Sequence, residues 1–142
     1  MQCWHQSQPL EQFYKIKQLC EKIDALFIQF SYASGNTNRN ETSERERIAK
    51  SKVETLLMAT NILKPSYIVP FANFSYFSNV DNFYHNDSIN EIDYIFDELQ
   101  KTKSEPIILY PGDKWEIGRS HENQASIAKY KESYNKLKKA EL

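Results

Sequence analysis

The chain has 142 residues, of which 40% are hydrophobic and 26% are charged, a composition typical of one globular domain and unlike that of a disordered chain. Its formal net charge of −1 creates no field that attracts phosphate backbones or anionic lipid, so we expect neither nucleic acid nor a membrane as a partner. The first residues lack a basic region followed by an apolar one, and no run of about 18 apolar residues occurs, so we expect a cytoplasmic protein.

The N-terminal third of the chain shows one helical pattern and one strand pattern. Apolar residues at helical spacing predict a helix over 9–23, and a short apolar run predicts a buried strand at 25–31. The pattern Ser43-x-x-Glu46 is a capping box, which places a hydroxyl and a carboxylate on the free amides at a helix start. It predicts a long helix that ends near Leu63, because a proline follows.

The same alternation continues through the rest of the chain. A second strand is expected at 67–71, where the internal proline should mark its end. A second capping box, Ser88-x-x-Glu91, predicts another helix, and a third strand is expected at 106–110 before a Pro-Gly turn. The last helix should span 124–140.

Helices and strands that alternate in this way predict a small α/β domain with a mostly parallel sheet and crossover helices. We interpret residues 1–142 as a single domain. Three strands form a narrow sheet, and such a sheet would leave an apolar face or edge uncovered. We therefore expect a partner layer or a further part of the chain to complete it.

Candidate ligand-binding residues follow the strands, because the ligand crevice of an open α/β sheet lies beyond the carboxyl ends of its strands. The loops at these ends are rich in amides, carboxylates and aromatic rings, and the predicted ligand-binding residues are Asn73, Tyr76, Asp81, Asn82, Tyr84 and Asp113. The alternative interpretation is structural: Asp and Asn residues form turns and cap helices, and Asp113 would fix the turn after Pro111-Gly112.

Recognisable catalytic and metal-binding patterns are missing from the sequence. His85 with Asp81 and Asp87 could be imagined as a metal cluster, but the spacing is not diagnostic, and we assign no metal ligand. Phosphate-binding loops and nucleophile motifs do not occur, and three glycines offer little backbone for them. An enzyme that uses Asp113 or Asp81 as an acid or base remains an open alternative.

Three stretches resemble a known family. They run from Asp24 to Ala33, from Leu63 to Asp87 and from Tyr110 to Asp113, and together they cover most of residues 20–115 in order. They resemble metallo-β-lactamase-superfamily proteins of the branch related to the CMP-N-acetylneuraminate hydroxylases and their bacterial relatives. The resemblance implies a four-layer αββα fold whose dinuclear metal site is assembled from two halves of a longer chain. This chain would correspond to the C-terminal half.

The sequence departs from that family where the metals would bind. The H-x-H-x-D-H motif of the N-terminal half does not occur, and His5, His85 and His121 are the only histidines. Complete family members hold zinc, iron or manganese, whereas we expect no cofactor in this chain. The resemblance thus implies a hydrolase-like segment that is inactive alone and associates with a second copy or a complementary N-terminal half. The alternative is a non-catalytic module that binds a small polar ligand or a protein through the loop face around residues 72–87.

Overall fold

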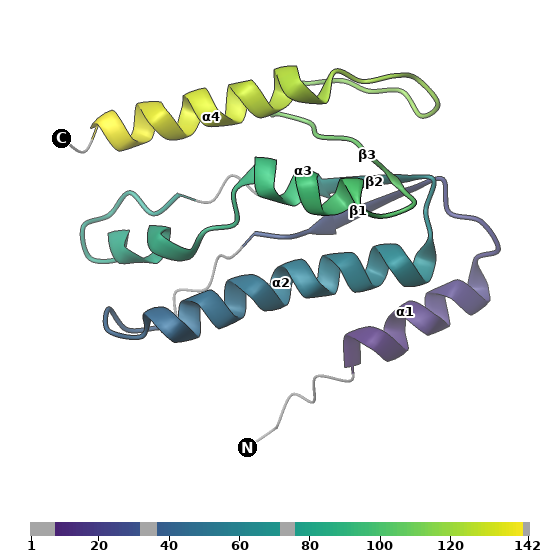
Figure 1. The fold of residues 1–142 in the computed structure, drawn as a ribbon, viewed down its shortest axis with the longest axis horizontal. Helices are drawn as coiled ribbons and strands as arrows, with labels where there is room; N and C mark the ends of the chain where they lie inside the picture. Colours follow the sequence, from purple (N-terminus) through teal and green to yellow (C-terminus); the bar gives the residue numbers. More distant parts are fainter. Residues whose placement is uncertain (1–7, 32–36, 72–75, 141–142) are drawn as a thin grey trace.

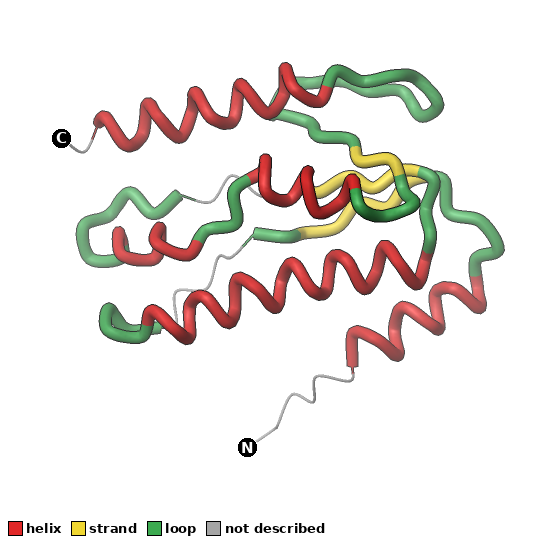
Figure 2. Tube along the Cα trace, viewed as in Figure 1, coloured by secondary structure: helices red, strands yellow, loops and turns green. Residues whose placement is uncertain are grey.

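The computed structural model describes residues 8–31, 37–71 and 76–140, and it confirms the α/β class. Figure 1 shows the chain folding into helices arranged along a small sheet, and Figure 2 separates helices, strands and loops by colour. The elements in chain order are α1 (Gln8–Leu19), β1 (Ala25–Gln29), α2 (Thr42–Leu63), β2 (Tyr67–Phe71), the 3-10 helix η1 (Phe83–Ser88), α3 (Ile92–Gln100), β3 (Glu105–Pro106) and α4 (Asn123–Ala140).

The sheet is parallel, as predicted, and its strands lie in the order β1-β2-β3. Ala25 lies opposite Tyr67 at one end of the β1–β2 ladder, and Gln29 lies opposite Phe71 at the other. Successive side chains of a strand point to opposite faces. The sheet therefore has an inner face, with side chains such as Ile68 in the hydrophobic core, and an outer face on its other side.

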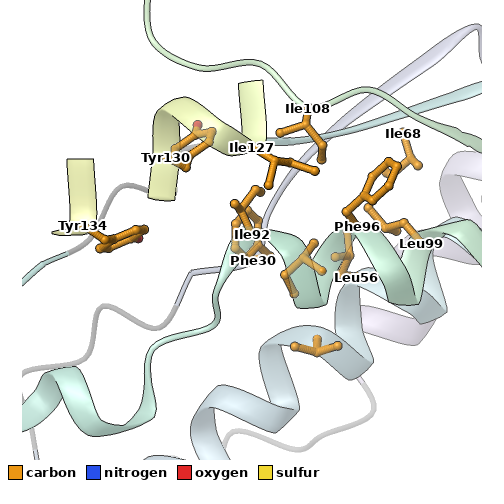
Figure 3. Packing of buried hydrophobic residues seen from close by; sticks show 12 residues of the cluster. Phe30, Leu56, Ile68, Ile92, Phe96, Leu99, Ile108, Ile127, Tyr130 and Tyr134 are labelled. Atoms are coloured by element: carbon orange, nitrogen blue, oxygen red, sulfur yellow. The ribbon is translucent and has the colours of Figure 1, made fainter. Parts of the chain in front are cut away.

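The core lies between the inner face of the sheet and the helices α2, α3 and α4. In Figure 1 the strands lie behind α3, with α2 on one side of it and α4 on the other. Figure 3 shows side chains from these helices pointing into one shared space. The buried cluster consists of Phe30, Val53, Leu56, Ile68, Ile92, Ile95, Phe96, Leu99, Ile108, Ile127, Tyr130 and Tyr134. Helix α1 packs against α2.

The outer face is covered only in part. The ring of Trp115, from the segment before α4, packs edge-on against Tyr67 with ring centroids 4.9 Å apart. Farther along the strands, Phe27 and Phe71 contact each other with centroids 6.4 Å apart, and they remain 54% and 45% exposed. The two rings form a small exposed aromatic patch on this face.

The capping box predicted at the start of α2 is wrong. The helix begins at Thr42, with Glu41 in the N-cap position and no side-chain capping bond. Glu41 instead accepts a hydrogen bond from the backbone N–H of Asn38 at 2.6 Å, which ties the loop to the helix start. Because the helix begins before Ser43, that hydroxyl is already past the position where capping is needed.

The second predicted capping box is also wrong. Helix α3 begins at Ile92, and its N-cap residue Glu91 makes no side-chain capping bond. Ser88 ends η1 and donates its hydroxyl to Asp87 Oδ1 at 2.8 Å. The Ser88 hydroxyl therefore bonds to the neighbouring Asp87 carboxylate and does not cap α3.

The third strand is shorter than predicted because of a proline in its neighbour. The N–H of Ile107 donates to the carbonyl of Ile68, so the backbone groups of Ile68 face β3. By alternation those of Pro70 face β3 as well, and proline has no N–H to donate. The β2–β3 ladder therefore ends at Pro106, whereas β2 continues past Pro70 to Phe71 on its β1 side.

Candidate functional site

An ion pair between the buried side chain of Arg45 and the partly exposed carboxylate of Asp87 joins the segments that follow β1 and β2. Arg45, in the first turn of α2, is 1% exposed and donates Nε to Asp87 Oδ1 at 2.9 Å and Nη2 to Asp87 Oδ2 at 2.6 Å. Its guanidinium also donates to the carbonyl of Asn38 at 2.6 Å, to that of Arg39 at 3.3 Å and to the hydroxyl of Thr42 at 3.0 Å. These bonds from Arg45 hold the pKa of Asp87 below its ordinary value.

His85 lies beside this ion pair and is buried among aromatic rings. Its imidazole is 4.3 Å from the ring of Tyr84 and 4.9 Å from that of Phe77, between centroids, and Nδ1 is 3.4 Å from the hydroxyl oxygen of Thr37. Burial lowers the pKa of His85, and the positive charge of Arg45 lowers it further. The neutral imidazole is thus the favoured form, and the ring serves as a packing element.

A pocket of about 460 Å³ opens next to the Arg45–Asp87 pair. We call it the loop-face pocket and define it by its aromatic residues Tyr76, Phe83 and Tyr84 and its basic residues Arg39 and Lys138. The rings of Tyr76 and Phe83 meet edge-on at 6.3 Å between centroids. Such a mixture of flat apolar walls and a few polar groups is typical of small-molecule sites.

The walls of the loop-face pocket are held from behind. The Tyr84 hydroxyl donates to the carbonyl of Thr37 at 2.7 Å, and the Arg45 guanidinium lies 4.9 Å from the centre of the Tyr84 ring. The ring of Tyr76 packs on Tyr134 of α4, with centroids 6.2 Å apart. The aromatic walls are therefore positioned before any ligand arrives.

Some charged residues at the loop-face pocket form ion pairs and others do not. Asp87 is bound by Arg45, and within the described residues Arg39, Lys138 and Glu91 make no ion pair. The Arg39 guanidinium lies 5.6 Å from the centre of the Tyr84 ring. Two exposed cations against one exposed carboxylate leave the pocket with a small positive excess, which favours an anionic group over a cationic one.

The predicted ligand-binding residues are only partly brought together. Tyr76 and Tyr84 line the loop-face pocket, and Asn82 lies at the start of η1, directly before it. Asn82 Oδ1 is buried and, within the described residues, has no hydrogen-bond partner. Asp81 is exposed, and its backbone N–H donates a hydrogen bond to Asn79 Oδ1 at 3.0 Å, which forms a turn. Asn73 lies outside the described residues.

Asp113 lies apart from these residues, at a turn that leads towards α4. Its carboxylate accepts hydrogen bonds from the Tyr110 N–H at 2.9 Å, from the Ser126 hydroxyl at 2.6 Å and from Lys129 Nζ. The bond from Lys129, followed by those from Ser126 and the Tyr110 N–H, lowers the pKa of Asp113 to about 2. The carboxylate therefore fixes the turn and the start of α4.

A second pocket of about 460 Å³ lies at the end of the sheet beside that turn. Phe27 and Phe71 of the outer face line one part of it, and Tyr110, Asp113 and Tyr130 line another. Because the Asp113 carboxylate is already engaged by three donors, this pocket offers mainly apolar surface.

Sequence reasoning missed Arg45, and a usable signal for it existed. Arg45 lies four residues before Ala49 and eight before Val53, both buried in α2, so it belongs to the apolar stripe of that helix. A charged residue in phase with a buried stripe must find partners inside the protein. The two cations Arg39 and Lys138 gave no comparable signal, since exposed basic residues occur throughout the chain.

The metal centre implied by the family resemblance does not fit the described residues. Among them, no group of three His, Cys, Asp or Glu side chains could hold a metal ion.

No helix in the described part of the chain is both long and apolar enough to cross a bilayer. No protein-family model, no curated protein and no solved structure matches the chain.

Proposed function

We propose that this chain is a non-catalytic binding module whose loop-face pocket takes a small ligand with a flat apolar part and an anionic group. The observation that carries the proposal is the pairing of aromatic walls at Tyr76 and Tyr84 with two cations, Arg39 and Lys138, that have no carboxylate partner in the described structure. Aromatic walls supply contact area, and the cations supply direction and charge recognition.

The division of labour between the two arginines supports this function. The Arg45 guanidinium donates hydrogen bonds to Asp87, to Thr42 and to a loop carbonyl. Its role is therefore structural, and its N–H groups are not available to a ligand. Arg39 touches the edge of the same pocket and keeps its guanidinium at the surface, over Tyr84. A rigid first layer with a free cation in front of it is a favourable arrangement for binding, because little ordering is needed.

Three probes separate the parts of this proposal in isothermal titration calorimetry. The first is 1-naphthyl phosphate, which has a flat ring and an anion; the second is 1-naphthol, which lacks the anion; the third is inorganic phosphate, which lacks the ring. We expect saturable binding of 1-naphthyl phosphate and at least about tenfold weaker binding of the other two, a difference of about 1.4 kcal/mol. Equal binding of all three, or binding of none, would contradict the proposal.

Matched variants place the binding at the pocket. Arg39→Gln and Lys138→Gln each remove one cation of the pocket, and we expect each to weaken 1-naphthyl phosphate binding several-fold. Lys103→Gln removes an exposed cation elsewhere and is the control, with unchanged affinity expected. If the control weakens binding as much as the two pocket variants, the interaction is a general charge effect and the pocket is not the site.

A second candidate function is a metallo-β-lactamase-fold segment, inactive alone and completed by a second copy or an N-terminal half. The observation that favours it is the incomplete cover of one sheet face: α2, α3 and α4 pack on the inner face, whereas Phe27 and Phe71 on the outer face stay half exposed, although Val69 on that face is buried. In an αββα arrangement that outer face is where the second sheet would pack. Elemental analysis of the purified protein tests this segment, and stoichiometric zinc, iron or manganese would overturn the idea that it holds no metal alone.

A further inference from the structure

The two edge strands of the sheet differ in whether their outward backbone groups are hydrogen-bonded. At the outer edge of β3 and the residues that follow it, Asn123 accepts from the Ile108 N–H at 2.8 Å and donates to the Pro106 carbonyl at 2.9 Å. His121 Nε2 lies 2.6 Å from the Ile108 carbonyl oxygen, and Pro106 has no N–H to offer. Side chains thus occupy the backbone groups with which another strand would pair.

The edge at β1 has no such protection. In the parallel ladder, Leu26 and Ile28 direct their backbone groups to β2, so those of Ala25, Phe27 and Gln29 point away from the sheet. Within the described residues, none of these outward N–H and C=O groups has a hydrogen-bond partner. The strand contains no proline and no charge, and its register with β2 is continuous. The devices that usually block an edge strand are absent from it.

We propose that β1 pairs in antiparallel register with β1 of a second copy, centred on Phe27. In this register Phe27 lies opposite its own copy and Ala25 lies opposite Gln29 of the other chain. All three outward residues then form hydrogen-bonded pairs, because each pair exchanges two backbone bonds. The surface is self-complementary about one residue, which is the requirement for a two-fold symmetric interface.

Charge favours a second copy as the occupant of this edge. The strand Ala25–Gln29 is uncharged, and the whole chain carries a formal charge of only −1, so two copies approach without strong repulsion. A copy of β1 also supplies alternating apolar side chains that match its own. No other chain is needed to provide a strand of this chemistry.

The area available predicts a weak dimer. The pairing places the exposed rings of Phe27 and Phe71 beside those of the other chain on one continuous face. At exposures of 54% and 45%, these two rings offer roughly 200 Å² per copy. Stable dimers usually bury about 800 Å² per partner, so we expect a dissociation constant above tens of micromolar. The β1 edge is separate from the loop-face pocket, so either proposal can fail alone.

Sedimentation equilibrium over about 10 µM to 1 mM tests this interface. We expect a monomer–dimer equilibrium for the natural chain and at least about tenfold weaker association for Gln29→Lys, which places a charge at the edge. Gln100→Lys is the matched control, since it makes the same change on the exposed end of α3. A chain that stays monomeric at 1 mM, or a Gln29→Lys variant that dimerises as strongly as the control, would overturn the proposal.

Disulfide trapping tests the register. In a variant with Cys3 and Cys20 replaced by serine, we expect Phe27→Cys to form an intermolecular disulfide under mild oxidation, because directly paired residues lie about 5.5 Å apart between Cα atoms. Leu26→Cys, whose side chain points to the inner face, should cross-link much less. Equal trapping at both positions would contradict the proposed pairing.

Discussion

Arg45 and Asp87 lie 42 positions apart in the chain, and the guanidinium of one grips the carboxylate of the other through two hydrogen bonds of 2.9 and 2.6 Å. Arg47 grips Glu44 in the same way, at 2.8 and 2.6 Å, but on the surface of α2 and only three positions apart. The same type of arginine–carboxylate pair thus occurs once with a buried arginine that links distant segments, and once on the solvent-exposed surface of a helix. Burial decides which of the two pairs matters for the fold.

Replacing the buried arginine should be costly. Arg45→Lys cannot reproduce the two bonds to Asp87, which would keep the bond from Ser88 and at most one from the lysine, so we expect a loss of about 1–3 kcal/mol in the free energy of unfolding. Urea titration followed by circular dichroism measures it. Arg47→Lys is the matched control, because its pair is solvent-exposed, and its loss should stay below about 1 kcal/mol. Equal losses in both variants would contradict the role given to Arg45.

Stability should fall in mildly acidic solution because of His85. Burial lowers the pKa of His85 below its ordinary value of 6.5, so the unfolded chain binds this proton more tightly than the folded one. The free energy of unfolding should therefore be insensitive to this group above pH 6.5 and decrease as the pH falls below it. Urea titrations between about pH 7.5 and 5 measure this slope, and His85→Gln should flatten it. A variant with the natural slope would show that another group is responsible.

The two aspartates predicted as ligand residues should behave differently when neutralised. Asp113→Asn weakens the bonds from Ser126 and Lys129, and we expect a loss of roughly 1–3 kcal/mol in unfolding free energy. Asp81→Asn changes an exposed carboxylate and should cost less than about 0.5 kcal/mol. Because the pKa of Asp113 is lowered to about 2, its contribution should persist above pH 3.8 and disappear as the pH falls towards 2. Similar losses for both variants would refute the structural role of Asp113.

Asn82 should be replaceable without loss of stability. Its buried Oδ1 has no partner among the described residues, and its side chain makes no capping bond to η1. Removing an unsatisfied polar atom forfeits no hydrogen bond, so Asn82→Ala should change the unfolding free energy by no more than about 0.5 kcal/mol, or raise it. Thermal denaturation measures this change. A decrease above about 1 kcal/mol would show that the amide has a partner in solution.

The helices and strands with a clear apolar repeat could be predicted from the sequence, whereas the helix caps and the end of the third strand could not. The second strand lies at Tyr67–Phe71 as expected, and the long helix ends at Leu63 as expected, because apolar spacing follows the backbone repeat directly. The first capping box was wrong because α2 begins at Thr42, before Ser43, and the second because the Ser88 hydroxyl donates to Asp87. The third strand ended early because Pro70 faces it, which depends on the register between strands.

The candidate site was predictable only in outline. Tyr76 and Tyr84 share a pocket because both follow β2 and because Arg45 draws the preceding loop against them. Asp113 follows β3, and its bonds to Ser126 and Lys129 hold that turn against α4, away from the pocket. Which loops meet depends on tertiary contacts between residues far apart in the chain, and a single sequence does not reveal them.

The most direct test of the proposed binding function is nuclear magnetic resonance of the isotope-labelled chain during titration with 1-naphthyl phosphate. Binding at the loop-face pocket predicts saturable shifts of the backbone amides of Arg39, Tyr84 and Lys138, while those of exposed residues such as Lys103 stay in place. Absence of saturable shifts, or shifts centred on Phe27 and Phe71 of the outer face, would contradict the account.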